Sequence, residues 1–261
     1  MEDNAILLVA IGTFFLAGMV KGVAGLGLPT VSLAIITVVI DLPTAMTLLV
    51  VPSLVTNLWQ GVAGRHFKII MVRLWPFLLC ATVFVSVGTI GFFQVDISLL
   101  SLLLGILISG YALSGLTGFK FDLNHSQQKW LGPLLGGING IFTGLTGSFV
   151  VPGVMYLKAV GFSREQLMQS MGILFSLSTV ALALSLKKNE LFSMQLGVIS
   201  LYSVAPAIFG MIIGQKIRNQ LSEAVFNRAF YFSLMGMGLY IALAAIISLS
   251  TCNTLANCSV S

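Results

Sequence analysis

Charged residues are scarce in this sequence. Asp, Glu, Lys and Arg together make up 8% of its 261 residues, whereas a typical soluble domain carries about 25%. So few charges cannot cover a body of this size with groups that water solvates. This excludes a soluble enzyme, a disordered chain and a nucleic-acid-binding protein. Hydrophobic residues contribute 57% of the chain and the mean hydropathy is +1.02. We therefore predict an integral membrane protein surrounded mainly by the lipid bilayer.

Cysteine and histidine are also rare, with three and two residues. Cys80 lies in an apolar run, where cysteine acts as a small hydrophobic residue. Cys252 and Cys258 lie in a polar tail and could form a disulfide if that tail faces an oxidising compartment. His66 and His125 have no Cys or acidic partner at metal-ligand spacing, and the sequence contains no zinc-protease or Gly-x-Ser-x-Gly motif. We predict no metal, no cofactor and no enzymatic activity.

Eight apolar segments are candidates for crossing the membrane. A helix needs roughly 20 residues to span the hydrocarbon core. The runs are continuously apolar rather than alternating, which favours helices over a β-barrel. Six segments are uninterrupted, and two, residues 5–40 and 131–160, contain a break. The uninterrupted segments are 43–62, 74–93, 97–116, 167–186, 194–214 and 226–249.

The two breaks are rich in glycine and end in proline. They occupy residues 21–29 and 140–152. Such residues leave backbone groups unpaired, which lipid cannot satisfy. In the first segment we expect helical arms at residues 5–20 and 29–40, about 16 and 12 residues long. Both arms would be short for a full crossing.

The breaks also repeat. Three glycines recur in the same order with an offset of 122 residues, and a proline follows each set after a one-residue shift. We therefore predict an internal duplication, with the first repeat at residues 1–122 and the second at 123–261, within one membrane domain. The matched pairs are Gly18 with Gly140, Gly22 with Gly144, Gly25 with Gly147, Pro29 with Pro152, and, further along, Gly88 with Gly214.

Lys and Arg predict the orientation, because they concentrate in cytoplasmic loops. If each interrupted segment is a hairpin that enters and leaves on one side, Lys187 and Lys188 lie outside and ten basic residues lie inside. Each repeat then has three full crossings, an odd number, so the repeats are inverted and both termini are periplasmic. The fold predicted is an all-α polytopic membrane protein with two inverted repeats, each a broken-helix hairpin plus three transmembrane helices. The ten inside residues are Arg65, Lys68, Arg73, Lys120, Lys129, Lys158, Arg164, Lys216, Arg218 and Arg228.

Inverted repeats with broken helices are typical of secondary transporters, whose site lies at the repeat interface near the midplane. An alternative interpretation is that the glycines only allow close helix packing. The motifs at residues 21–29 and 143–152 resemble the TauE/SafE family of sulfite exporters, and the resemblance covers most of the chain. It implies export or exchange of small sulfur-containing or organic anions, such as sulfite and sulfoacetate, across the bacterial inner membrane.

Backbone N–H groups at a broken turn can bind an oxyanion, and glycine lets the anion approach. We expect the tips of the two hairpins to meet near the midplane and enclose the anion. Lys21 is the only charged residue inside the first break. Polar residues of the neighbouring helices either line the path or bond between helices. The predicted substrate-binding residues are Lys21, Gly22, Gly25, Gly27, Asn57, Gln60, Thr143, Gly144, Thr146, Gly147, Ser148 and Gln169. An anion channel on the same scaffold is the alternative function.

Overall fold

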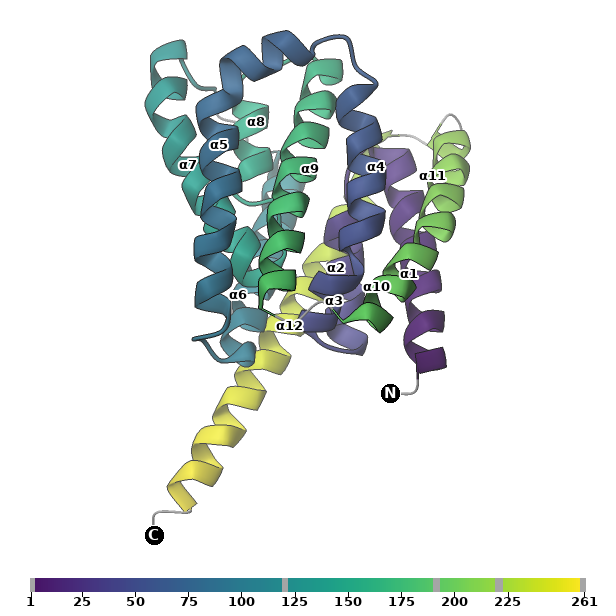
Figure 1. The fold of residues 1–261 in the computed structure, drawn as a ribbon, viewed down its shortest axis with the longest axis vertical. Coiled ribbons are helices and arrows are strands. Elements are labelled where there is room, and N and C mark those ends of the chain that lie inside the picture. The colour runs from purple at the N-terminus through teal and green to yellow at the C-terminus, as the bar shows by residue number, and fades with distance from the viewer. Residues whose placement is uncertain (1–2, 119–121, 190–192, 219–222, 259–261) are drawn as a thin grey trace.

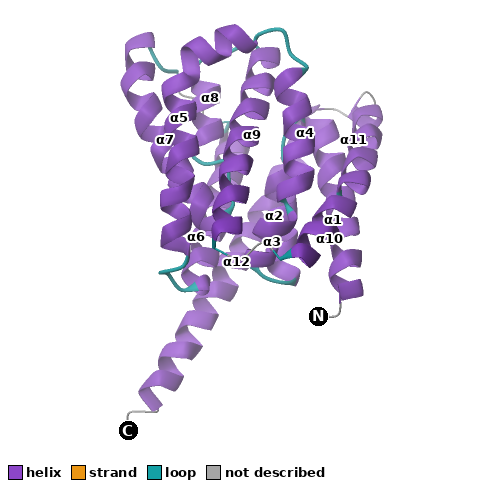
Figure 2. Cartoon of the chain, in the orientation of Figure 1, coloured by secondary structure: helices purple, strands orange, loops and turns teal. Residues whose placement is uncertain are grey.

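The computed structural model describes residues 3–118, 122–189, 193–218 and 223–258, and this part of the chain contains helices and no strand (Figures 1 and 2). The side chains of Cys252 and Cys258 fall outside what it describes. The helices are α1 (Asp3–Ala24), α2 (Leu28–Val39), α3 (Leu42–Leu48), α4 (Val50–Val62), α5 (Phe67–Phe92), α6 (Ile97–Thr117), α7 (His125–Thr146), α8 (Gly153–Ala159), α9 (Arg164–Lys188), α10 (Met194–Tyr202), α11 (Val204–Arg218) and α12 (Glu223–Cys258).

The apolar runs form the membrane-spanning helices. Six helical stretches of the described chain are long and apolar enough to cross a bilayer, and α3 with α4, bent by 44°, makes a seventh candidate. All six uninterrupted segments predicted from the sequence are helical. Several helices begin where a polar side chain accepts a hydrogen bond from an amide of the first turn, which stabilises the helix end. These capping residues are Asp41, Asp96, Ser163 and Ser193.

Both breaks are shorter than the sequence predicts. α1 continues to Ala24 and α7 continues to Thr146. Each helix ends only where a glycine adopts a positive φ, 77° at Gly25 and 72° at Gly147, a conformation that side chains disfavour. α1 therefore has 22 residues and is itself long enough to span the bilayer, so the expectation of a 16-residue arm is wrong.

Several glycines of the repeated motif lie inside helices and permit close packing. A Cβ on Gly18 would lie 2.1 Å from the Ala207 carbonyl oxygen, and a Cβ on Gly140 would lie 2.6 Å from that of Ala81. A Cβ on Gly22 would lie 2.3 Å from a carbonyl oxygen of α11, and a Cβ on Gly144 would lie 2.3 Å from one of α5. These four glycines therefore allow close helix packing. As a result α1 packs along α11, and α7 packs along α5.

The helices form one bundle, with both termini at its lower end in Figure 1. α4 and α9 pack against each other in the centre, α5 and α7 form one edge, and α1 and α11 form the other. α6 packs on α12. The loop between α4 and α5 lies at the upper end. This arrangement places the C-terminal ends of α1, α4 and α11 near the start of α9.

Candidate functional site

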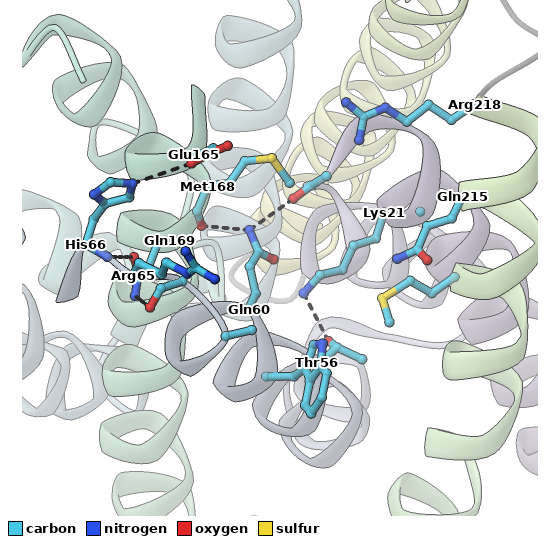
Figure 3. A pocket seen from close by; sticks show the side chains of 16 residues that line it. Lys21, Thr56, Gln60, Arg65, His66, Glu165, Met168, Gln169, Gln215 and Arg218 are labelled. Atoms are coloured by element: carbon cyan, nitrogen blue, oxygen red, sulfur yellow. Dashed lines mark hydrogen bonds and ion pairs between the residues drawn. The ribbon is translucent and has the colours of Figure 1, made fainter. Parts of the chain in front are cut away.

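A cavity of about 600 Å³ lies between α1, α4, α9 and α11 (Figure 3). Gly22 and Gly25 form part of its wall. Its rim comes from the α4–α5 loop, the first turn of α9 and the last turn of α11, which contribute Arg65, Glu165 and Arg218. Arg65 and Glu165 are exposed, so the cavity opens at the upper end of the bundle.

Lys21 lies deep in this cavity, in the last turn of α1. Its side chain is buried, with the residue 4% exposed. The ammonium donates to Thr56 Oγ1 at 3.1 Å and to Asn57 Oδ1, both on α4. No carboxylate of the described residues forms an ion pair with it. A buried cation is therefore held by neutral oxygen atoms alone.

The polar contacts continue from Lys21 into the centre of the bundle. Asn57 Nδ2 donates to Ser53 Oγ at 2.9 Å, and Ser53 Oγ lies 3.5 Å from Thr179 Oγ1 of α9. Thr56 Oγ1 also donates to the Pro52 carbonyl at 2.8 Å. The ammonium thus ends a hydrogen-bonded series that links α1, α4 and α9. This series fixes the position of Lys21 relative to the central helix pair.

Two glutamines connect the same helices around the cavity. Gln60 Nε2 donates to the carbonyl oxygens of Gly25, at 3.2 Å, and Met168, at 2.8 Å. Gln169 Nε2 donates to the carbonyls of Gly61 and Gly64, and its Oε1 accepts from the His66 amide. Both side chains therefore bond between helices while they also line the cavity.

The amides of Gly25 and Gly147 are not free donors, contrary to the sequence-based hypothesis. The N–H of Gly25 donates to the Lys21 carbonyl at 2.7 Å, and that of Gly147 donates to the Thr143 carbonyl at 2.8 Å. These bonds complete the last turns of α1 and α7, as expected for a glycine that ends a helix. Gly27 packs against Val20 and Phe230 and does not line the cavity.

The second break lies elsewhere, so the expectation of one site enclosed by both breaks is wrong. Thr143, Thr146 and Ser148 are buried and none lines the cavity. Their hydroxyl and amide groups bond within the break: Thr143 Oγ1 donates to the Ser148 carbonyl, and the Ser148 amide donates to Thr146 Oγ1. Gly144 packs on α5.

The two breaks are separated because each packs against the other half of the chain. Gly25 contacts Met168 of α9, and Gly147 contacts Met46 of α3. The two contacts are equivalent, because Gly147 follows Gly25 by 122 residues and Met168 follows Met46 by the same number. Met168 lies near the upper start of α9, whereas Met46 lies at the lower, N-terminal side of the central helix formed by α3 and α4.

Positive charge dominates the cavity lining. The lining contains three strongly basic residues, Lys21, Arg65 and Arg218, and one acidic residue, Glu165. The Glu165 side chain is 86% exposed and lies 3.5 Å from His66. An excess of cations raises the local concentration of anions. Three lining residues, Arg65, Arg218 and Thr56, were not predicted from the sequence. Thr56 could have been predicted, because it is next to Asn57 in the sequence. Nothing in the sequence indicates that Arg218 lies beside α1.

A family model described as Sulfite exporter TauE/SafE matches residues 10–241. The chain belongs to the TauE/SafE family of sulfite exporters. The match covers most of the chain and confirms the resemblance seen in the glycine motifs. TauE/SafE members are membrane transporters and not enzymes, which agrees with the apolar helices of this chain. No curated protein and no solved structure matched the chain.

Proposed function

We propose that this TauE/SafE protein is a secondary transporter of small anions, of the sulfite or organosulfonate type, that binds its substrate at Lys21. One observation carries the proposal: a buried ammonium with only neutral partners forms the inner end of an open, positively charged cavity. An ammonium inside a membrane costs about 3 kcal/mol on insertion scales. Such residues normally pair with another charge, and here the anion supplies it.

The donors for the anion are side chains. The Lys21 ammonium has three N–H groups, and two bond to Thr56 and Asn57. One sulfonate or sulfite oxygen accepts from the third, and another displaces Asn57 Oδ1, because a charged acceptor binds an ammonium more strongly than a neutral amide. Arg65 and Arg218 at the rim attract the anion from the aqueous phase.

The two halves are inverted copies in this proposal. The exchanged contacts of Gly25 with Met168 and of Gly147 with Met46 support it, as does the common end of the two termini in Figure 1. The cavity opens at the end where Arg65 and Arg218 lie. By the distribution of basic residues this end is cytoplasmic, so both termini are periplasmic in a bacterial inner membrane.

Transport requires the opposite end to open in turn. There, Gly147 is packed by the buried side chains of Leu33, Met46 and Leu49, and Thr143 occupies the position equivalent to Lys21. Rocking of one repeat against the other would close the Lys21 cavity and open this region. An open cavity at one end with tight packing at the other favours such a carrier over a channel, which needs a continuous path.

A proteoliposome uptake screen tests the proposal. The anions are sulfite, sulfate, thiosulfate, sulfoacetate and simple carboxylates. We expect saturable uptake of one or more sulfur oxyanions, with mutual competition among those transported. Ohmic, non-saturating conductance in planar bilayers would assign the protein to the channel class instead, and no flux of any anion would reject both functions.

A further inference from the structure

A second basic cavity lies outside the transport site, at the edge of the bundle formed by α5 and α7. It has a volume of about 730 Å³ and is lined by residues of these two helices and by Tyr156 of α8. Three cations border it, Lys68 and Arg73 from α5 and Lys129 from α7, and its lining contains no acidic residue. The cavity is therefore strongly positive on one side of a membrane-facing surface.

Apart from Gln128, the rest of the lining is apolar and aromatic. Ile69, Val72 and Trp75 are exposed side chains on its wall, and Pro76 and Phe77 follow along α5. Trp75 is 57% exposed and Trp130, next to Lys129, is 61% exposed. Tryptophans beside basic residues are typical of the boundary between headgroups and hydrocarbon. The cavity thus combines a positive upper part with an apolar wall, as an amphipathic ligand requires.

Arg73 is held in place for an anionic partner. Its Nε donates to Gln128 Oε1 at 3.0 Å, its Nη2 donates to the Val160 carbonyl at 2.8 Å, and its guanidinium lies 5.0 Å from the centre of the Phe162 ring. A guanidinium has five N–H donors, so others remain for a phosphate. Among the described residues, Lys68 and Lys129 form no hydrogen bond or ion pair.

The predicted duplication does not explain these three basic residues, because the equivalent positions in the other repeat are not basic. With Gly88 aligned on Gly214, an offset of 126 residues, Lys68 and Arg73 correspond to Met194 and Ile199, and with the 122-residue offset of the breaks Lys129 corresponds to Leu7. The three equivalent positions on α1 and α10 are therefore apolar, and one of them, Ile199, is buried. A general excess of basic residues at one membrane face only sets orientation. Here the three cations meet at one walled cavity, which is the arrangement that binds lipid headgroups between helices.

We propose that this cavity binds one anionic phospholipid, with its phosphate between Lys68, Arg73 and Lys129 and its acyl chains along Ile69, Val72 and Trp75. A zwitterionic lipid offers the same phosphate but adds a cation that the three basic residues repel. The site is independent of the anion transport proposed for the Lys21 cavity. Its occupant stabilises the contact between α5 and α7, the helices that the cavity joins.

Fluorescence quenching tests this site on the purified, delipidated full chain. Substituting Trp59→Phe and Trp130→Phe leaves Trp75 as the only tryptophan, and the probes are brominated phosphatidylglycerol and brominated phosphatidylcholine with identical chains. We expect saturable quenching by phosphatidylglycerol and much weaker quenching by phosphatidylcholine. Equal quenching by the two lipids would overturn the proposal.

A double variant assigns the binding to the cations. At about 1 kcal/mol per basic residue near an anionic headgroup, K68Q with K129Q weakens phosphatidylglycerol affinity about 30-fold. The matched control is K187Q with K188Q, at the opposite end of the bundle, which leaves affinity unchanged. A folded double variant, judged by its melting transition, that binds as tightly as the control overturns the proposal. Displacement of the lipid by soluble glycerol phosphate at similar concentrations would do so too.

Discussion

The ammonium of Lys21 donates a hydrogen bond to the side-chain oxygen of Asn57, 36 residues away on another helix. This contact places a buried cation beside the central helix pair α4 and α9 without a carboxylate to neutralise it. A carboxylate of the protein paired with Lys21 would occupy the anion-binding position permanently. A neutral amide holds the ammonium and still yields to an anion, because an anionic acceptor binds it more strongly.

Replacing Lys21 by methionine removes the charge and keeps most of the volume. Hydrogen bonds to charged groups contribute about 1.5–3 kcal/mol, so we expect K21M to lower sulfur-oxyanion uptake about 10- to 100-fold. The protein should still fold, since the variant no longer buries a charge. Uptake rates in proteoliposomes measure the effect. K187Q is the control, and wild-type uptake by K21M would remove Lys21 from the site.

Replacing Asn57 by aspartate supplies an internal anion. The carboxylate occupies the position of the amide and pairs with Lys21, so it competes with the substrate at every concentration. We expect N57D to lose transport while its thermal stability rises, a combination that simple damage to the fold does not produce. The same chemical change at the lower end of α9, N189D, serves as the control. Normal uptake by N57D would contradict the assignment.

Arg218 acts at the rim, where a cation affects encounter more than the bound state. We expect R218Q to raise KM for the anion a few-fold and leave kcat unchanged, with the difference fading at high salt. K216Q is a close control, because Lys216 lies on the same helix, is exposed and does not line the cavity. The measurement is initial uptake rate against substrate concentration at two ionic strengths. A kcat effect that persists in salt would place Arg218 in the translocation step instead.

Gly18 allows α1 to approach α11. A Cβ there would lie 2.1 Å from the Ala207 carbonyl oxygen, and overpacking of this kind costs about 1–3 kcal/mol. We therefore expect G18A to lower the melting temperature. Gly12 on the same helix has no atom within 4 Å of its Cβ position, so G12A should be neutral or stabilising by about 0.5–1 kcal/mol. Equal melting temperatures for the two variants would refute close packing at Gly18.

Much of the fold could be predicted from the sequence, for a simple reason. A run of about 20 apolar residues has few stable arrangements in a bilayer other than a spanning helix, and such runs produced α5, α6, α9 and α12. The repeat stays a prediction, based on glycine and proline residues that have specific conformational uses. The residues at which α1 and α7 end could not be predicted from the sequence. Gly22 and Gly144 are compatible with a helix when a neighbour packs against them, so these helices end only at Gly25 and Gly147.

The site was only partly predictable. Lys21 stood out because a charge inside an apolar run needs a partner, and Asn57 and Gln60 stood out as polar residues on one helix. Arg218 depends on α11 lying beside α1, a contact that only tertiary packing sets. The expected meeting of the two breaks failed because each break packs on the opposite half, Gly25 on Met168 and Gly147 on Met46.

Calorimetric titration of the purified protein with sulfite measures anion binding at Lys21 without transport. We expect saturable binding of one sulfite per chain to the wild type, competition by an organosulfonate, and loss of measurable binding in K21M with the K187Q control unaffected. Sulfite binding of equal affinity in K21M and the wild type would contradict it.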